Sequence, residues 1–207
     1  FITALFTLTN IHAQEWLGYN TSNYAGIHAV QYNPALITET NYNKLDISII
    51  AANVHAESNY LFLNSITLTD PVNTFSDPDF KDKYIRQNLD LNKKSATIYA
   101  NVQSPAFLLQ ISNRDAIGFC VRPRVFVNVD LVDRFLAQLI YEGLNYPPQW
   151  DREFRNDWMS ASANLWMEYD FTYARTWLKN DHYKLKGGIT FKLLQGIGAA
   201  GLGIRDF

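Results

Sequence analysis

The chain's clearest pattern is an alternation of apolar and polar side chains over residues 159–173. The odd positions, from Met159 to Tyr173, are all apolar or aromatic, and the even positions are mostly polar. Because successive side chains of a β-strand point to opposite faces, this pattern predicts a strand over about 158–178. That length exceeds the roughly 5–6 residues common in soluble strands. It fits a tilted strand that crosses a bilayer and continues beyond it.

Three further segments, 95–103, 117–129 and 185–193, alternate in the same way, with one apolar face and one face of charged or amide side chains. In a membrane barrel the polar faces point into a wet lumen. The charged side chains that this rule places in the lumen are Arg122, Arg124, Glu168, Asp170, Lys184, Lys186 and Lys192. They could form a selective lining or hold a plug. For any single one, solvation of the interior is the simpler interpretation.

The alternation shifts phase inside residues 44–68 and again across Ser104-Pro105. A shift of one residue is the effect of a β-bulge, where proline is tolerated. Residues 44–68 could therefore be one bulged strand or a hairpin. The connectors favour the single strand, because long and short ones then alternate, as in outer-membrane barrels. The long connectors are 69–94 and 130–157, and the short ones are 112–115 and 179–181.

The second long connector contains a helical pattern over residues 130–144. One face of this helix carries Leu131, Phe135, Leu136 and Leu139. Asp130 can cap the N-terminus, and Gly143 lies near the C-terminal end. Such a helix could be a lid over the barrel mouth or a helix packed at its rim. Both interpretations remain open from the sequence.

The N-terminal region differs from the rest. Residues 1–14 combine an apolar run with a small residue near the end, which is typical of a partial signal peptide, although an N-terminal strand is an alternative. The chain starts without Met and ends inside strand-like sequence, so we expect a fragment clipped at both ends. Residues 15–43 form a separate segment with helix-like apolar spacing, interrupted at Asn33-Pro34.

Composition and motifs favour no catalytic or nucleic-acid-binding role. The net charge is −2, which favours no nucleic-acid partner. The four histidines are widely spaced and there is one cysteine, so we expect neither a metal site nor an internal disulfide. No catalytic motif with adequate spacing occurs, and we predict no enzyme activity, no catalytic residue and no cofactor. The aromatic content of 14% suits strands and membrane interfaces, but equally a soluble β domain.

Several short motifs resemble a known group. A signal-like start, YNPAL at 32–36 and KLDISI at 44–49 resemble the start of FadL-like outer-membrane proteins. That group includes the long-chain fatty-acid channel and the PorV-type barrels of a Bacteroidota secretion system. The stretches SPAFLLQISNRDAIGFCVRPR (104–124) and GGITFKLLQGIGAA (187–200) look like uncharacterised Bacteroidota barrel proteins, a domain of unknown function.

The resemblance implies an all-β fold: the first part of an antiparallel transmembrane β-barrel over residues 44–207, with about five strands present. Residues 15–43 would be a helical hatch in the lumen, anchored by Asn33, Pro34 and Ala35. The location would be the cell outer membrane, with its lipid as partner. The implied function is a channel for small hydrophobic compounds. The alternatives are a docking platform for secretion or surface proteins, and a secreted soluble β-sandwich that binds a ligand, in which case residues 22–40 would be a helix capping the sheet.

Overall fold

The computed structural model describes residues 22, 25–39, 44–63, 71–180 and 182–206. The expected signal segment 1–14 and parts of 15–43 lie outside this set. The contacts divide the chain into two compact units. The first comprises Phe1–Asn53, Gln103–Val121 and Tyr169–Leu193; the second comprises Val54–Val102, Arg122–Glu168 and Leu194–Phe207.

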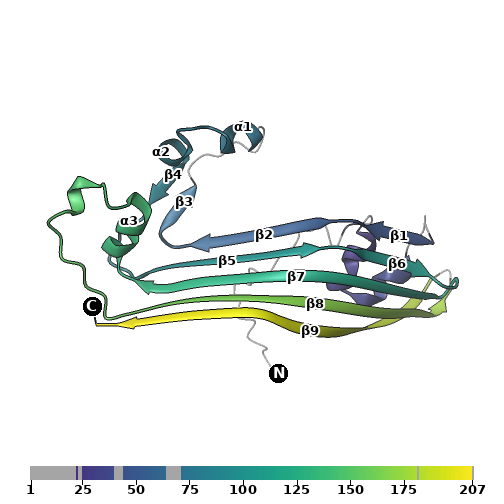
Figure 1. The fold of residues 1–207 in the computed structure, drawn as a ribbon. Helices are drawn as coiled ribbons and strands as arrows, with labels where there is room; N and C mark the ends of the chain where they lie inside the picture. Colours follow the sequence, from purple (N-terminus) through teal and green to yellow (C-terminus); the bar gives the residue numbers. More distant parts are fainter. Residues whose placement is uncertain (1–21, 23–24, 40–43, 64–70, 181, 207) are drawn as a thin grey trace, which may run out of the picture. The chain divides into compact units, whose positions relative to one another are not determined.

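The described residues are mostly antiparallel β-structure, as the alternating segments predict (Figure 1). The strands are β1 (Leu45–Ser48), β2 (Ala51–Ser58), β3 (Leu61–Leu63), β4 (Ile85–Gln87), β5 (Lys94–Gln103), β6 (Ala106–Gln110), β7 (Asp115–Val132), β8 (Trp158–Lys179) and β9 (Lys184–Arg205). Seven of them form one sheet in the order β1-β6-β7-β5-β2, with β8 paired to β7 and β9 to β8. The other two, β3 and β4, pair with each other.

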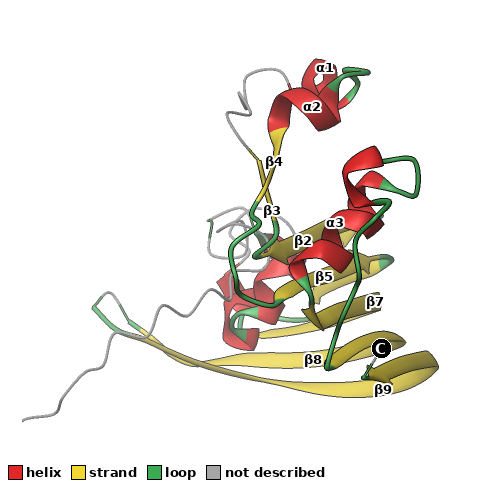
Figure 2. Cartoon of the chain, turned by 90° about the vertical axis from the view of Figure 1, so that its left-hand side faces the viewer, coloured by secondary structure: helices red, strands yellow, loops and turns green. Residues whose placement is uncertain are grey.

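The short helices are η2 (Gly26–Gln31), η3 (Pro34–Glu39), α1 (Pro71–Phe75), α2 (Phe80–Tyr84), α3 (Arg134–Glu142) and η4 (Pro147–Gln149). The helix η2 contacts β1 and β6. The helices α1 and α2 lie between β3 and β4 along the chain, in a connector for which the sequence predicted no helix (Figure 2). Within the part of the chain that is described, no helix is both long and apolar enough to cross a membrane.

The two phase shifts mark interruptions of long strands. β5 and β6 both pair with β7 and are separated at Ser104-Pro105, whose peptide bond is cis. β1 and β2 run antiparallel beside them: the Ser104 hydroxyl donates to the Ile49 carbonyl at 2.5 Å, and the Asn59 N–H donates to the Ser95 carbonyl at 3.2 Å. Residues 45–58 therefore pass along the sheet once, as the connectors favoured. Residues 61–63 instead pair with β4, which the sequence pattern did not predict.

The helix in the second long connector begins later than predicted. The Asp133 carboxylate, not that of Asp130, caps it by accepting from the Phe135 N–H at 2.8 Å. The reason is that β7 continues to Val132 through Leu131, whose φ of 60° produces an irregularity at the strand end. Gly143 ends the helix with a φ of 80°.

Candidate functional site

The strands β7 and β8 bury polar side chains on one face and expose apolar side chains on the other. On β8, Glu168 and Asp170 are 3% and 2% exposed. Phe171, the next residue, points to the opposite face and is 53% exposed. On β7, Arg122 is fully buried at 0%. Soluble domains do the reverse, because charged side chains are almost never fully buried. We call the face that carries Tyr99, Asn101, Gly118, Arg122, Arg124, Glu168, Asp170 and Thr172 the polar face, and the opposite side the apolar face.

In the second unit, a charged cluster ties three strands together across the polar face. The Arg122 Nη2 donates to Glu168 Oε1 at 2.6 Å, and the Arg124 Nε lies 2.8 Å from Glu168 Oε2. The Arg124 Nη1 also donates to the Tyr99 hydroxyl at 2.6 Å, which accepts from Asn101 Nδ2 at 3.3 Å. Arg122, Arg124 and Glu168, three of the predicted lumen residues, thus meet in one cluster. Tyr99 and Asn101 were not predicted as site residues.

The three predicted lysines lie on β9. The Thr190 hydroxyl is 2.8 Å from that of Thr172, so Thr190 belongs to the polar face. Lys184, Lys186 and Lys192 lie an even number of residues from Thr190, and the strand period places them on the same side. Lys184 and Lys192 are exposed and Lys186 is half-buried. Their positions along the strand are consistent with the predicted polar face. Their burial does not distinguish them from the other side chains of β9.

In the first unit, residues 25–38 cover the polar face, starting from an anchor on β1. The Ile27 N–H donates to Asp46 Oδ2 at 2.9 Å. Gly26 has a φ of 51°, and a Cβ at this position would lie 1.9 Å from the same oxygen. Only glycine tolerates both the left-handed backbone and this close approach. The Asp46 carboxylate therefore holds the first turn of η2 against the sheet.

The Asn-Pro-Ala motif packs against β9. The Asn33 Oδ1 accepts from the Ala35 N–H at 3.0 Å, so the side chain caps η3. A Cβ built on Gly188 would lie 2.7 Å from the Pro34 carbonyl carbon and 2.8 Å from the Ala35 nitrogen. The motif's backbone thus rests directly on the strand at a position where a side chain would not fit. At the end of the segment the Thr176 hydroxyl donates to that of Thr38 at 3.2 Å.

An apolar cluster lies between this segment and the wall. Ile27, Val30 and Ile37 of the segment pack with small or apolar residues of the sheet, which are Ala106, Leu108, Ala116, Cys120 and Ala174. Burial lowers the pKa of His28, which favours its neutral imidazole in this setting. Alongside, the Gln31 Nε2 donates to Gln103 Oε1 at 2.8 Å. The polar face is therefore locally apolar beneath residues 25–38.

Replacing Gly188 with leucine should loosen this segment. Overpacking typically costs about 1–3 kcal/mol, so we expect the buried thiol of Cys120 to react with a maleimide about tenfold faster. Cys120 is the only cysteine and is 4% exposed beneath the segment. Gly198→Leu is the matched control, because a Cβ at Gly198 meets nothing within 4 Å. Equal labelling rates in the two variants would show that Gly188 does not hold the segment down.

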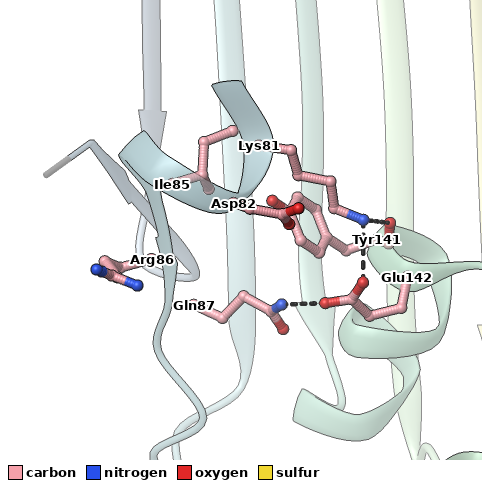
Figure 3. A pocket seen from close by; sticks show the side chains of 7 residues that line it. All are labelled: Lys81, Asp82, Ile85, Arg86, Gln87, Tyr141 and Glu142. Atoms are coloured by element: carbon pink, nitrogen blue, oxygen red, sulfur yellow. Dashed lines mark hydrogen bonds and ion pairs between the residues drawn. The ribbon is translucent and has the colours of Figure 1, made fainter. Parts of the chain in front are cut away.

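Away from the strands, α2, β4 and α3 surround a hollow of about 240 Å³ (Figure 3). The Lys81 Nζ lies 3.0 Å from Glu142 Oε2 and 4.2 Å from the centre of the Tyr141 ring. The Gln87 Nε2 donates to the other oxygen of Glu142. The hydrogen bond from Lys81 lowers the pKa of the Glu142 carboxyl. These groups satisfy one another, so the hollow joins the two long connectors and offers no evident chemistry.

Comparison with known proteins gives a family and no function. Residues 34–207 match a family described as "Family of unknown function (DUF5723)". No curated protein and no solved structure matches the chain. Among the described residues, no three His, Cys, Asp or Glu side chains are grouped so that they could hold a metal ion.

Proposed function

Since the chain belongs to the DUF5723 family, whose function is unknown, we propose from its geometry that it is an outer-membrane β-barrel protein that passes small hydrophobic compounds. One observation carries the proposal: the same strands bury charged side chains and expose apolar ones. Arg122 and Glu168 are buried, whereas Phe171, on the opposite face of β8 from Glu168, is half exposed. That arrangement costs free energy in water and is the normal one in a membrane barrel.

The apolar face supports a lipid environment in detail. The Phe119 ring lies between those of Phe107 and Phe171, with centres 5.6 and 4.8 Å away and the ring planes tilted, so an aromatic row crosses three strands. The charge-free odd positions of β8 run from Met159 to Phe171. With a rise of about 3.3 Å per residue and a tilt near 45°, that stretch spans about 28 Å, close to the apolar band of such barrels.

Polar side chains mark one end of this band. The Tyr173 hydroxyl donates to Asp115 Oδ1 at 2.7 Å, and Arg175 lies 3.5 Å from the same oxygen. Tyr173 follows Phe171 on the apolar face, and aromatic residues with polar tips are favoured at membrane interfaces. In this proposal the hydrocarbon region ends at Tyr173, next to the tight turn that precedes β7.

The hydrophobic character of the substrate is supported by the wall beneath residues 25–38. A polar lumen lined throughout by charge would not attract an apolar molecule. Here, however, Leu108, Ala116 and Cys120 form an apolar wall that the segment covers. The resemblance to FadL-like proteins points to the same class of compound. A hatch over an apolar wall would leave a binding surface for a small apolar molecule once the segment is displaced.

The alternative, a platform that docks secretion or surface proteins, has one observation in its favour. The long connectors carry α1, α2, α3 and the β3–β4 pair, joined through Lys81 and Glu142. A simple pore does not require such ordered loops. This second function needs the same barrel and differs in what the loops bind.

Cells with and without the protein separate these functions. We expect the protein in the outer-membrane fraction, released only by detergent, and faster uptake of a labelled long-chain fatty acid or hydrocarbon when it is present. Unchanged uptake together with large partners that co-purify would favour the platform. Release from the cells without detergent would contradict both and favour a secreted β-sandwich.

A further inference from the structure

The helix α3 packs on the apolar side of the sheet. Ala137 of α3 is buried with Tyr60 and Val132, and Met159 and Val129 pack against the same cluster. Val129 pairs in register with Ala96, whereas the neighbouring pair, Thr97 and Asn128, is joined by a side-chain hydrogen bond of 2.8 Å and belongs to the other face. Met159 is one of the odd, apolar positions of β8. The helix therefore covers the end of the face that the proposed function assigns to lipid.

The outer side of this helix and the loop after it expose large apolar side chains. Ile140, Leu144 and Trp150 are 69%, 81% and 69% exposed. The indole Nε1 of Trp150 donates to the Leu144 carbonyl at 3.1 Å, which fixes the loop. Three apolar side chains held in water by an ordered loop are unfavourable, and tryptophan beside aliphatic residues is typical of segments that lie in a membrane interface.

Two guanidinium groups lie on a single aromatic ring beside them. The Cζ atoms of Arg134 and Arg152 are 4.4 and 3.9 Å from the centre of the Phe135 ring. Arg134 also donates to the Leu89 carbonyl at 3.2 Å. Within the described residues, neither guanidinium forms an ion pair with a carboxylate. Two cations that contact one ring lie close enough to repel each other, and an anion that contacts both guanidinium groups would offset that repulsion.

We propose that residues 134–152 bind membrane lipid, with Arg134 and Arg152 holding an anionic headgroup phosphate and Ile140, Leu144 and Trp150 entering the acyl boundary. A guanidinium presents paired donors that match phosphate oxygens, and contact with the Phe135 ring restrains both groups. The occupant is a lipid because the site is continuous, through α3, with the apolar face. This inference rests on the proposed membrane location and adds a headgroup preference to it.

The test compares headgroups on purified protein. The wild type, Arg134→Gln/Arg152→Gln and a control, Arg86→Gln/Arg155→Gln, are reconstituted in nanodiscs of phosphatidylcholine mixed equally with phosphatidylglycerol. Lipid retained on the released protein is counted by native mass spectrometry. The control removes two exposed arginines of the same unit that do not lie on the Phe135 ring. We expect the wild type and the control to retain phosphatidylglycerol preferentially, and the first variant to lose about thirtyfold of that preference.

An unchanged preference in Arg134→Gln/Arg152→Gln would overturn the inference, and so would an equal loss in the control. Competition by inorganic phosphate at the concentration of the lipid would also overturn it, because the site would then take a free anion. All three proteins are first tested for insertion by heat-modifiability on gels. If the wild type fails to insert, the proposed membrane location fails; if all insert with the same lipid preference, only the headgroup site fails.

Discussion

An arginine at Ala163 should abolish assembly of the protein in the outer membrane, whereas an arginine at the neighbouring Ser162 should be tolerated. Ala163 is an odd position of β8, on the apolar face and close to the centre of the charge-free stretch. Ser162 shares the side of Glu168. On the lipid side of a barrel, an arginine near the midplane costs about 2–4 kcal/mol. On the lumen side it meets water and the charged cluster.

The two variants are matched controls for each other, because they add the same side chain to adjacent residues of one strand. The measurement is the shift in gel mobility on heating, together with the amount of protein in the outer-membrane fraction. A soluble sheet would give no such asymmetry, since Ala163 and Ser162 are both only half-buried. Equal tolerance of the two arginines would therefore refute the assignment of the apolar face to lipid.

The strands were predictable because the alternation of apolar and polar residues that indicates a strand lies within the strand's own sequence. An alternation such as that of residues 159–173 fixes which side chains share a face, without any knowledge of the neighbouring strand. This is why β8 was expected at 158–178 and is found at Trp158–Lys179. It is also why Arg122, Arg124 and Glu168 were expected on one side, where they are found together.

The partners of those residues were not predictable, because they depend on how far one strand is shifted against the next. Nothing local says that Glu168 of β8 lies opposite Arg122 of β7, or that Tyr99 of β5 reaches Arg124. The stagger of neighbouring strands is set by the whole sheet. The sequence predicts a polar side, and only the pairing of the strands selects which charges meet.

Two anchors of residues 25–38 did leave signals in the sequence. Gly187-Gly188 inside a strand indicates a close backbone approach, and the structure places Pro34 and Ala35 there. Asp46 is an acidic residue in an otherwise strand-like stretch, and it accepts from the Ile27 N–H. The helices α1 and α2 left none, because helices of five residues are too short to establish a helical period.

Removing the charge of Glu168 should destabilise the folded protein by about 3–5 kcal/mol, the usual cost of breaking a buried ion pair. In Glu168→Gln the guanidinium groups of Arg122 and Arg124 lose the carboxylate that both contact. Arg122 is fully buried, so its guanidinium is shielded from the water that would otherwise replace that carboxylate. The measurement is urea unfolding of the purified protein in lipid, with Glu153→Gln, an exposed carboxyl in the loop, as the control.

A double variant tests whether Arg122 and Glu168 stabilise the sheet through their mutual interaction or independently of each other. If the buried charges matter through each other, Arg122→Met combined with Glu168→Leu should cost far less than the sum of the single changes. The reason is that replacing a whole buried pair by apolar groups removes its desolvation cost together with its attraction. Additive effects would mean that Arg122 and Glu168 act independently, for instance each through water in a wide lumen. The cluster would then be a solvated lining, and residues 25–38 alone would close the polar face.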